Sequence, residues 1–200
     1  MISSDSIPRS QCNQFSVDQL QQPAFPDFLC ESLSWAGLRG DWFSWHEPDE
    51  VPEPFRGLLV HEVDMTSTLE RHHGEHMILE VLADGRAAGY YFREVILRGA
   101  ETGRAAEFGL IEIEVSQFPE DLQEAILSGG IPLGGIMNES GMAYESRPLG
   151  YFSVAREKLP MKLSALGNDG TFYGRYNQLM RPDGNCLARI LEIIPRSSDS

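Results

Sequence analysis

The sequence predicts an α+β fold, in which two or three short helices pack on or beside one antiparallel sheet. From Gly57 onward, apolar segments of strand length follow one another and are separated by tight turns. Only short helical patterns interrupt them, and the long alternating helices that a doubly wound parallel sheet requires are missing. The order of the segments therefore favours neighbouring strands that run antiparallel.

The predicted strands are spread along the second half and middle of the chain. They cover residues 57–64, 76–84, 89–99, 104–115, 144–155, 170–180 and 185–195. Asp84-Gly85 is expected to form a turn, and "RPDG" (181–184) is expected to connect the last two strands. We see no internal repeat and no low-complexity segment.

The predicted helices are short. Residues 65–74 form one, because Ser67 and Glu70 have capping-box spacing and Gly74 suits the helix end. Residues 118–127 form a second, with a proline near its start and two glycines after it, and residues 33–39 can form a third. The glycine-rich stretch 129–137 predicts a helix stop and turn, or exposed backbone N–H groups near a ligand.

Composition predicts one domain and excludes several classes of partner. A chain of 200 residues with 42% hydrophobic content can build one sizeable core. Its 30 acidic against 16 basic residues give a formal charge of −14, which argues against nucleic acid and against an anionic membrane surface. Three widely spaced cysteines favour neither a disulfide framework nor a zinc site. With no signal-peptide pattern and no membrane-length apolar run, we expect a cytoplasmic monomer.

Two regions differ in their pattern. Residues 1–56 hold six of the twelve prolines and all three tryptophans, with little periodicity, and are expected to form an irregular arm that packs over the surface. Residues 57–200 are expected to form the main domain.

Charged residues in apolar rows are the main candidates for chemistry. Arg93 shares a strand face with Tyr91, Val95 and Leu97, whereas Glu94 lies on the other face and is expected to be an exposed or rim acid. Glu192 lies in a similar apolar row of the last strand and is the expected partner of Arg93. The two can form a structural ion pair, or Arg93 can face a cavity and bind a carboxylate through its planar fork.

Other candidates have plainer interpretations. His72, His73 and His76 could bind a metal, but their spacing favours a solvated helix end, so we predict no metal site. The glycine-rich stretch matches neither GxGxxG nor a P-loop. Asp64, Glu112 and Glu114 are interpreted as solvent-facing acids.

Five short stretches, in this order, give the chain a resemblance to the chorismate lyase (chorismate-pyruvate lyase) family over roughly residues 57–195. They are "DMTSTLE" (64–70), "FREVIL" (92–97), "IPLGGIM" (131–137), "FYGRYNQL" (172–179) and "ARILEIIP" (188–195).

The resemblance implies an antiparallel sheet of about six strands with helices that cover an internal ligand pocket. It also implies cofactor-independent cleavage of chorismate to 4-hydroxybenzoate and pyruvate. Arg93 would bind the ring carboxylate, and Glu192 would reach the hydroxyl and ether oxygens and assist the departure of the ether oxygen. Arg175 would meet the enolpyruvyl carboxylate.

Backbone groups around Met65, Leu133 and Gly134 would line the same pocket.

Three alternatives remain. A relative of this family could bind an aromatic carboxylate without chemistry, or could release 3-hydroxybenzoate; the same fold serves as the effector-binding domain of some bacterial transcription regulators. In a third interpretation, Arg93 and Glu192 only hold strands together.

Overall fold

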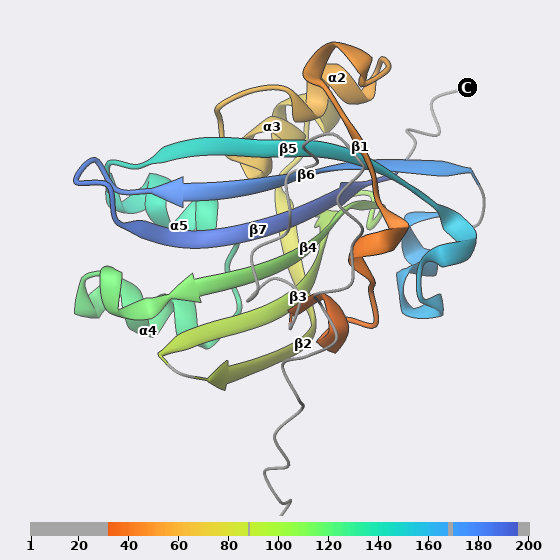
Figure 1. Ribbon diagram of the computed structural model, residues 1–200. Coiled ribbons are helices and arrows are strands. Elements are labelled where there is room, and N and C mark those ends of the chain that lie inside the picture. The colour runs from red at the N-terminus through yellow and green to blue at the C-terminus, as the bar shows by residue number, and fades with distance from the viewer. Residues whose placement is uncertain (1–31, 88, 168–169, 196–200) are drawn as a thin grey trace, which may run out of the picture.

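A computed structural model describes residues 32–87, 89–167 and 170–195, and its centre is one seven-stranded antiparallel sheet (Figure 1). The spatial order of the strands is β1-β5-β6-β7-β4-β3-β2. The strands are β1 (Ser44–His46), β2 (Met77–Ala87), β3 (Tyr90–Gly99), β4 (Ala105–Glu114), β5 (Glu145–Ala155), β6 (Thr171–Met180) and β7 (Cys186–Ile194). The predicted α+β class is confirmed, with seven strands in place of about six.

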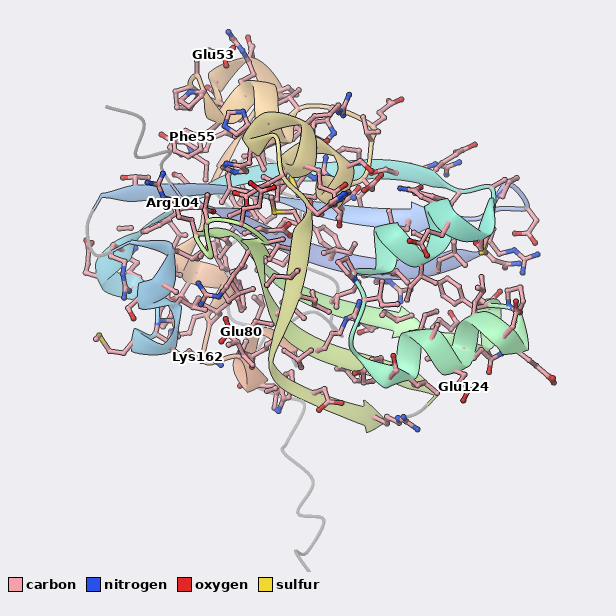
Figure 2. The ribbon with its side chains drawn as sticks, turned by 180° about the vertical axis from the view of Figure 1, so that it is seen from behind. Glu53, Phe55, Glu80, Arg104, Glu124 and Lys162 are labelled. Carbon is pink, nitrogen blue, oxygen red and sulfur yellow. The ribbon has the colours of Figure 1, made fainter. Side chains whose placement is uncertain are left out.

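Short helices cover one face of this sheet, as the view from behind shows (Figure 2). They are α2 (Phe55–Leu59), α3 (Met65–His73), α4 (Glu120–Ser128) and α5 (Leu133–Ser140). Five short 3₁₀ segments complete the structure: η1 (Gly40–Trp42), η2 (Pro48–Glu50), η3 (Val115–Gln117), η4 (Arg156–Lys158) and η5 (Met161–Leu166). None of the helices in the described ranges is long and apolar enough to span a membrane.

The helix predicted over residues 65–74 is confirmed, but its cap differs from the prediction. Asp64 precedes α3, and its Oδ1 accepts a hydrogen bond of 2.8 Å from the backbone N–H of Ser67. Gly74 ends the helix in the left-handed region, with φ of +70°. Asp64 is therefore the N-cap, because its carboxylate satisfies a first-turn amide that has no partner within the helix.

Two local predictions are wrong. Residues 57–64 form the end of α2 and a loop, and the carbonyl oxygens of Leu59, His61 and Val63 accept hydrogen bonds from Arg175 instead of from a strand. Asp84 and Gly85 form no turn, because β2 continues through both residues to Ala87 and pairs them with β3. The glycine-rich stretch also contains the start of α5, which we did not predict.

Residues 32–56 pack into the domain wherever the structure describes them. Residues 32–35 are helical, within the region where a short helix was expected, and β1 pairs with β5. Leu33, Leu38 and Phe43 are buried in the same apolar cluster as the central strands. The first 31 residues of the expected arm lie outside the described part.

The two faces of the sheet have different cores. On the face away from the helices, one continuous cluster joins the N-terminal segment, the central strands and η5. On the helix-covered face, apolar side chains form two separate clusters, one around α2 and α3 and one around α4 and α5. Charged side chains and a cavity lie on this second face.

Candidate functional site

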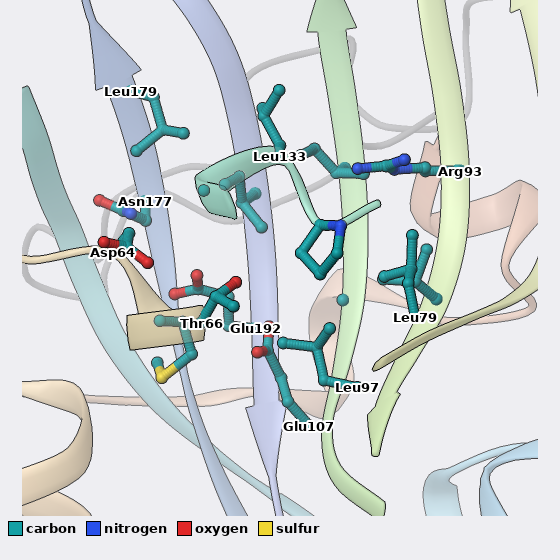
Figure 3. Close-up of a pocket in the computed structure, with 17 residues that line it drawn as sticks. Asp64, Thr66, Leu79, Arg93, Leu97, Glu107, Leu133, Asn177, Leu179 and Glu192 are labelled. Carbon is teal, nitrogen blue, oxygen red and sulfur yellow. The ribbon is translucent and has the colours of Figure 1, made fainter. Parts of the chain in front are cut away.

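A pocket lies between the sheet and the first turns of α3 and α5 (Figure 3). Four central strands supply its wall, together with Leu79 of β2. The lining residues are Asp64, Met65, Thr66, Leu79, Arg93, Val95, Leu97, Glu107, Gly109, Ile111, Pro132, Leu133, Gly134, Asn177, Leu179, Ile190 and Glu192.

Strand alternation explains why these side chains meet. Arg93, Val95 and Leu97 occupy alternate positions of β3 and therefore point to the same face. In β4, Glu107 lies opposite Leu97 and Ile111 lies opposite Arg93, which places the acid and the arginine at opposite ends of this row. Figure 3 shows the same separation, with Arg93 on one side and Glu107, Glu192 and Asp64 grouped on the other.

Arg93 is a buried cation with incomplete hydrogen bonding. Its side chain is 1% exposed, and its Nη1 donates one long hydrogen bond of 3.5 Å to the carbonyl oxygen of Ile131. Its Nε has no hydrogen-bond partner among the described residues. Burial lowers the pKa of the guanidinium, although Tyr91 and Asp84 oppose that effect. The guanidinium therefore keeps an unfilled Nε–H donor, while Tyr91 lies near it, with the Cζ atom of Arg93 6.0 Å from the centre of the Tyr91 ring.

Arg175 is buried as deeply, but each of its three side-chain nitrogens has a hydrogen-bond partner. Its Nε donates to Glu192 Oε2 in an ion pair between β6 and β7, where the two residues are register partners. Its other nitrogens donate to the carbonyl oxygens of Leu59, His61 and Val63 at 3.1–3.2 Å. The expected partnership of Glu192 with Arg93 is therefore wrong, because Arg175 holds Glu192.

Arg175 also lies outside the set of residues that line the pocket. Its Nη1 is 3.2 Å from Nδ1 of His61, and burial beside this cation lowers the pKa of His61. A neutral imidazole can accept that hydrogen bond. The arrangement ties the loop after α2 to the sheet, and the guanidinium has little capacity left for a ligand.

Glu107 and Glu192 form a pair of buried carboxyl groups in the pocket. Burial raises the pKa of both, and the charge of Glu192 raises that of Glu107 further. Arg175 opposes this effect and is bonded directly to Glu192. The ion pair with Arg175 therefore favours the ionised form of Glu192, whereas burial and the neighbouring charge of Glu192 favour the protonated form of Glu107.

Glu107 is a site residue that the sequence analysis missed. It is 4% exposed, and its Oε2 has no hydrogen-bond partner in the described part of the chain. The signal was present in "AAEFGLIEIE", because Glu107, Gly109, Ile111 and Ile113 alternate on one face. Gly109 leaves space there: a Cβ atom at this position would lie 3.0 Å from Val95 and 3.4 Å from Glu107.

The first turns of α3 and α5 close the pocket opposite the sheet. Met65, Leu133 and Gly134, which the resemblance placed at the pocket, do line it. Amides in a helical first turn have no partner within the helix and favour negative charge nearby. Gly134 is required for this approach, because a Cβ atom would lie 2.8 Å from Oδ1 of Asp64.

Three acids that we expected at the surface are buried, so these predictions are wrong. Glu94 is 1% exposed and bonded to Lys162 on the far face of the sheet, and Glu112 is buried and bonded to Arg189 at 2.9 Å. Asp64 is 7% exposed and accepts hydrogen bonds from Ser67, Asn138 and Tyr144. Both faces of the sheet are covered, so each strand acid in a central row is buried whichever way it points.

The histidines of "RHHGEH" lie at the exposed end of α3 and just beyond it. Among the described residues, no group of three His, Cys, Asp or Glu side chains is placed to hold a metal ion.

The cavity volume is about 60 Å³ in this structure. An engineered protein cavity of about 150 Å³ accommodates benzene. A ring-sized ligand therefore requires this pocket to widen.

Comparisons with known proteins support the fold alone. No family model and no curated protein sequence matches the chain. Among solved structures, the effector domain of PhnF from Mycobacterium smegmatis is similar, with a TM-score of 0.50 and 11% identity over 68% of this chain and 90% of that one. The longer PhnF structure gives a TM-score of 0.49 and 11% identity over 66% of this chain, which spans 63% of that protein.

Proposed function

We propose that this protein binds a small aromatic or enolpyruvyl carboxylate in the pocket, with Arg93 as the carboxylate anchor. The observation that carries the proposal is the buried Arg93 guanidinium, whose Nε has no partner in the described structure and which lines the cavity. A carboxylate is the acceptor that matches its planar fork. The apolar side chains around it, including Val95, Leu97 and Ile111, suit a hydrophobic ring.

Binding without turnover fits the site better than chorismate cleavage. Chorismate carries two carboxylates, and the second cation expected for it, Arg175, is engaged by Glu192 and three carbonyl oxygens. One solved structure with a similar fold is the effector domain of PhnF. A ligand with a single carboxylate needs only Arg93, so a binding role requires no second cation in the pocket.

One observation favours cleavage as the second candidate. Glu107 is a buried acid whose pKa is raised by burial and by the charge of Glu192, and it lines the same pocket as Arg93. A proton donor of this kind could assist departure of the ether oxygen of an enolpyruvyl group.

A direct experiment separates these functions. Benzoate and 4-hydroxybenzoate are titrated calorimetrically into the wild-type protein and into Arg93→Met, and chorismate is incubated with the wild type while pyruvate is measured. We expect both benzoates to bind the wild type, no binding to Arg93→Met and no pyruvate. Pyruvate release would establish the lyase, and equal binding by Arg93→Met would remove the proposal.

A further inference from the structure

The end of the pocket opposite Arg93 is strongly acidic. Three carboxyl groups line it, from Asp64, Glu107 and Glu192. Arg175 stands behind Glu192, and it is the only cation whose charge acts on Glu107 in the described part of the chain. If all three acids were ionised, this end would carry two uncompensated negative charges.

The three acids differ in how fully they are bonded. Asp64 caps α3 and accepts further hydrogen bonds from Asn138 and Tyr144. Glu192 is bonded to Arg175. Glu107 has no such partner: it is 4% exposed, lines the cavity, and its Oε2 makes no hydrogen bond to any described residue. A buried oxygen without a donor is the counterpart of the unpaired Nε of Arg93.

The spacing shows that one ligand can reach both ends. Glu107 lies opposite Leu97, four residues along β3 from Arg93. Four strand residues separate the backbone positions by about 13 Å, and the two side chains point to the same face and line the same pocket. Gly109 keeps the floor between them open.

From this geometry we infer that the ligand is zwitterionic, with a carboxylate bound by Arg93 and an ammonium group bound by Glu107 and Glu192. The inference rests on the proposed function and names its ligand class. A hydroxyl group would satisfy one acceptor and leave the second carboxyl unexplained, whereas an ammonium group donates three hydrogen bonds. With the ligand bound, Arg93 and Glu107 each face a group of opposite charge, and Glu192 keeps its ion pair with Arg175.

Binding of an ammonium group is expected to release a proton. Burial, Glu192 and Asp64 all raise the pKa of Glu107 and so favour its protonated form in the empty pocket, while Arg175 acts in the opposite direction. A cation beside it favours the ionised form. The proton therefore leaves as the ligand enters.

The test uses two probes of matched size, 4-(aminomethyl)benzoate and 4-(hydroxymethyl)benzoate, with the full-length protein. We expect the aminomethyl probe to bind the wild type at least about tenfold more tightly. Titrations in buffers of different ionisation enthalpy should show release of about one proton for that probe alone. Glu107→Gln should remove both the preference and the proton release.

The matched control variant is Glu94→Gln, because Glu94 is equally buried but lies on the far face of the sheet and bonds Lys162. It should keep the tenfold preference. Equal or tighter binding of the hydroxymethyl probe by the wild type would overturn the inference and leave the proposed function standing. Benzylamine, which has an ammonium group but no carboxylate, tests the inference separately from the proposed function. It should bind the wild type and Arg93→Met equally weakly, and it should not bind Glu107→Gln.

Discussion

Two buried arginines on the same face of the sheet have opposite hydrogen-bonding environments. Arg175 is 0% exposed and bonds Glu192, His61 and several carbonyl oxygens, so that its donors are occupied. Arg93 is 1% exposed and makes one long hydrogen bond to Ile131, and its Nε has no partner in the described ranges. The contrast teaches that burial alone does not identify a ligand-binding cation. A buried donor without a protein acceptor, such as Nε of Arg93, is the feature that indicates a ligand-binding cation.

The largest expected effect concerns Arg175. Replacing it with Met leaves the Glu192 carboxylate buried without its partner and frees the loop carbonyl oxygens that it holds. We expect Arg175→Met to lower the free energy of unfolding by about 3–5 kcal/mol. Urea denaturation at pH 7 measures this loss. A loss below about 1 kcal/mol would mean that Arg175 is no more structural than Arg93.

Arg93→Met should behave differently in the same assay. The guanidinium gives up its hydration and forms no ion pair with any described residue, so an apolar side chain of similar length replaces it without leaving an unpaired charge. We expect the free energy of unfolding to stay within about 1 kcal/mol of the wild type. A loss as large as that of Arg175→Met would contradict the contrast between the two arginines.

Glu107 gives a pH-dependent prediction. Its pKa lies well above the ordinary 4.5 in the folded protein. Between the two values the folded state holds a proton that the unfolded state has lost, so this residue makes stability fall as pH rises from 4.5 towards the folded pKa. We expect Glu107→Gln to lose less stability over that range than the wild type. The free energy of unfolding of both proteins is measured by urea denaturation at pH 4.5, 6 and 7.5. Equal losses for Glu107→Gln and the wild type over this range would contradict the assignment.

The smallest expected effect lies in the first turn of α5. Gly135 has open space around it, because a Cβ atom would come no closer than 3.7 Å to Ile131. We expect Gly135→Ala to raise the free energy of unfolding by about 0.5–1 kcal/mol, since alanine loses less backbone entropy in a helix. Gly134→Ala is the paired variant and should destabilise the protein, because its Cβ atom would meet Asp64.

Alternation along strands predicted much of the fold. The ranges of β3 to β7, the ends of α3 and α4, and the face of Arg93 all follow from apolar patterns and from Gly74, Pro119 and Gly129. The three-residue strand β1 could not be predicted, because it exists only through its pairing with β5. Residues 57–64 were mistaken for a strand, since nothing local shows that Arg175, over a hundred residues later, binds their carbonyl groups.

The candidate site was also predictable only in part, because its contacts join residues that are far apart in the sequence. A strand pattern tells which face Arg93 and Glu192 share, but it does not tell which cation pairs with Glu192. That choice depends on the register of β6 against β7, which sets Arg175 opposite Glu192. The burial of Glu94 could not be predicted either, because it depends on η5, whose Lys162 bonds Glu94 on the far face of the sheet.

The most direct test observes the two guanidinium groups themselves. The side-chain Nε–H resonances of arginine are followed by NMR during a titration with benzoate, and Arg93 and Arg175 are assigned from the signals lost in Arg93→Met and Arg175→Lys. The structure predicts that the Arg93 resonance shifts and gains protection from solvent exchange as its Nε acquires an acceptor, while the Arg175 resonance stays in place. A shift at Arg175 with none at Arg93 would contradict the assignment of the binding cation.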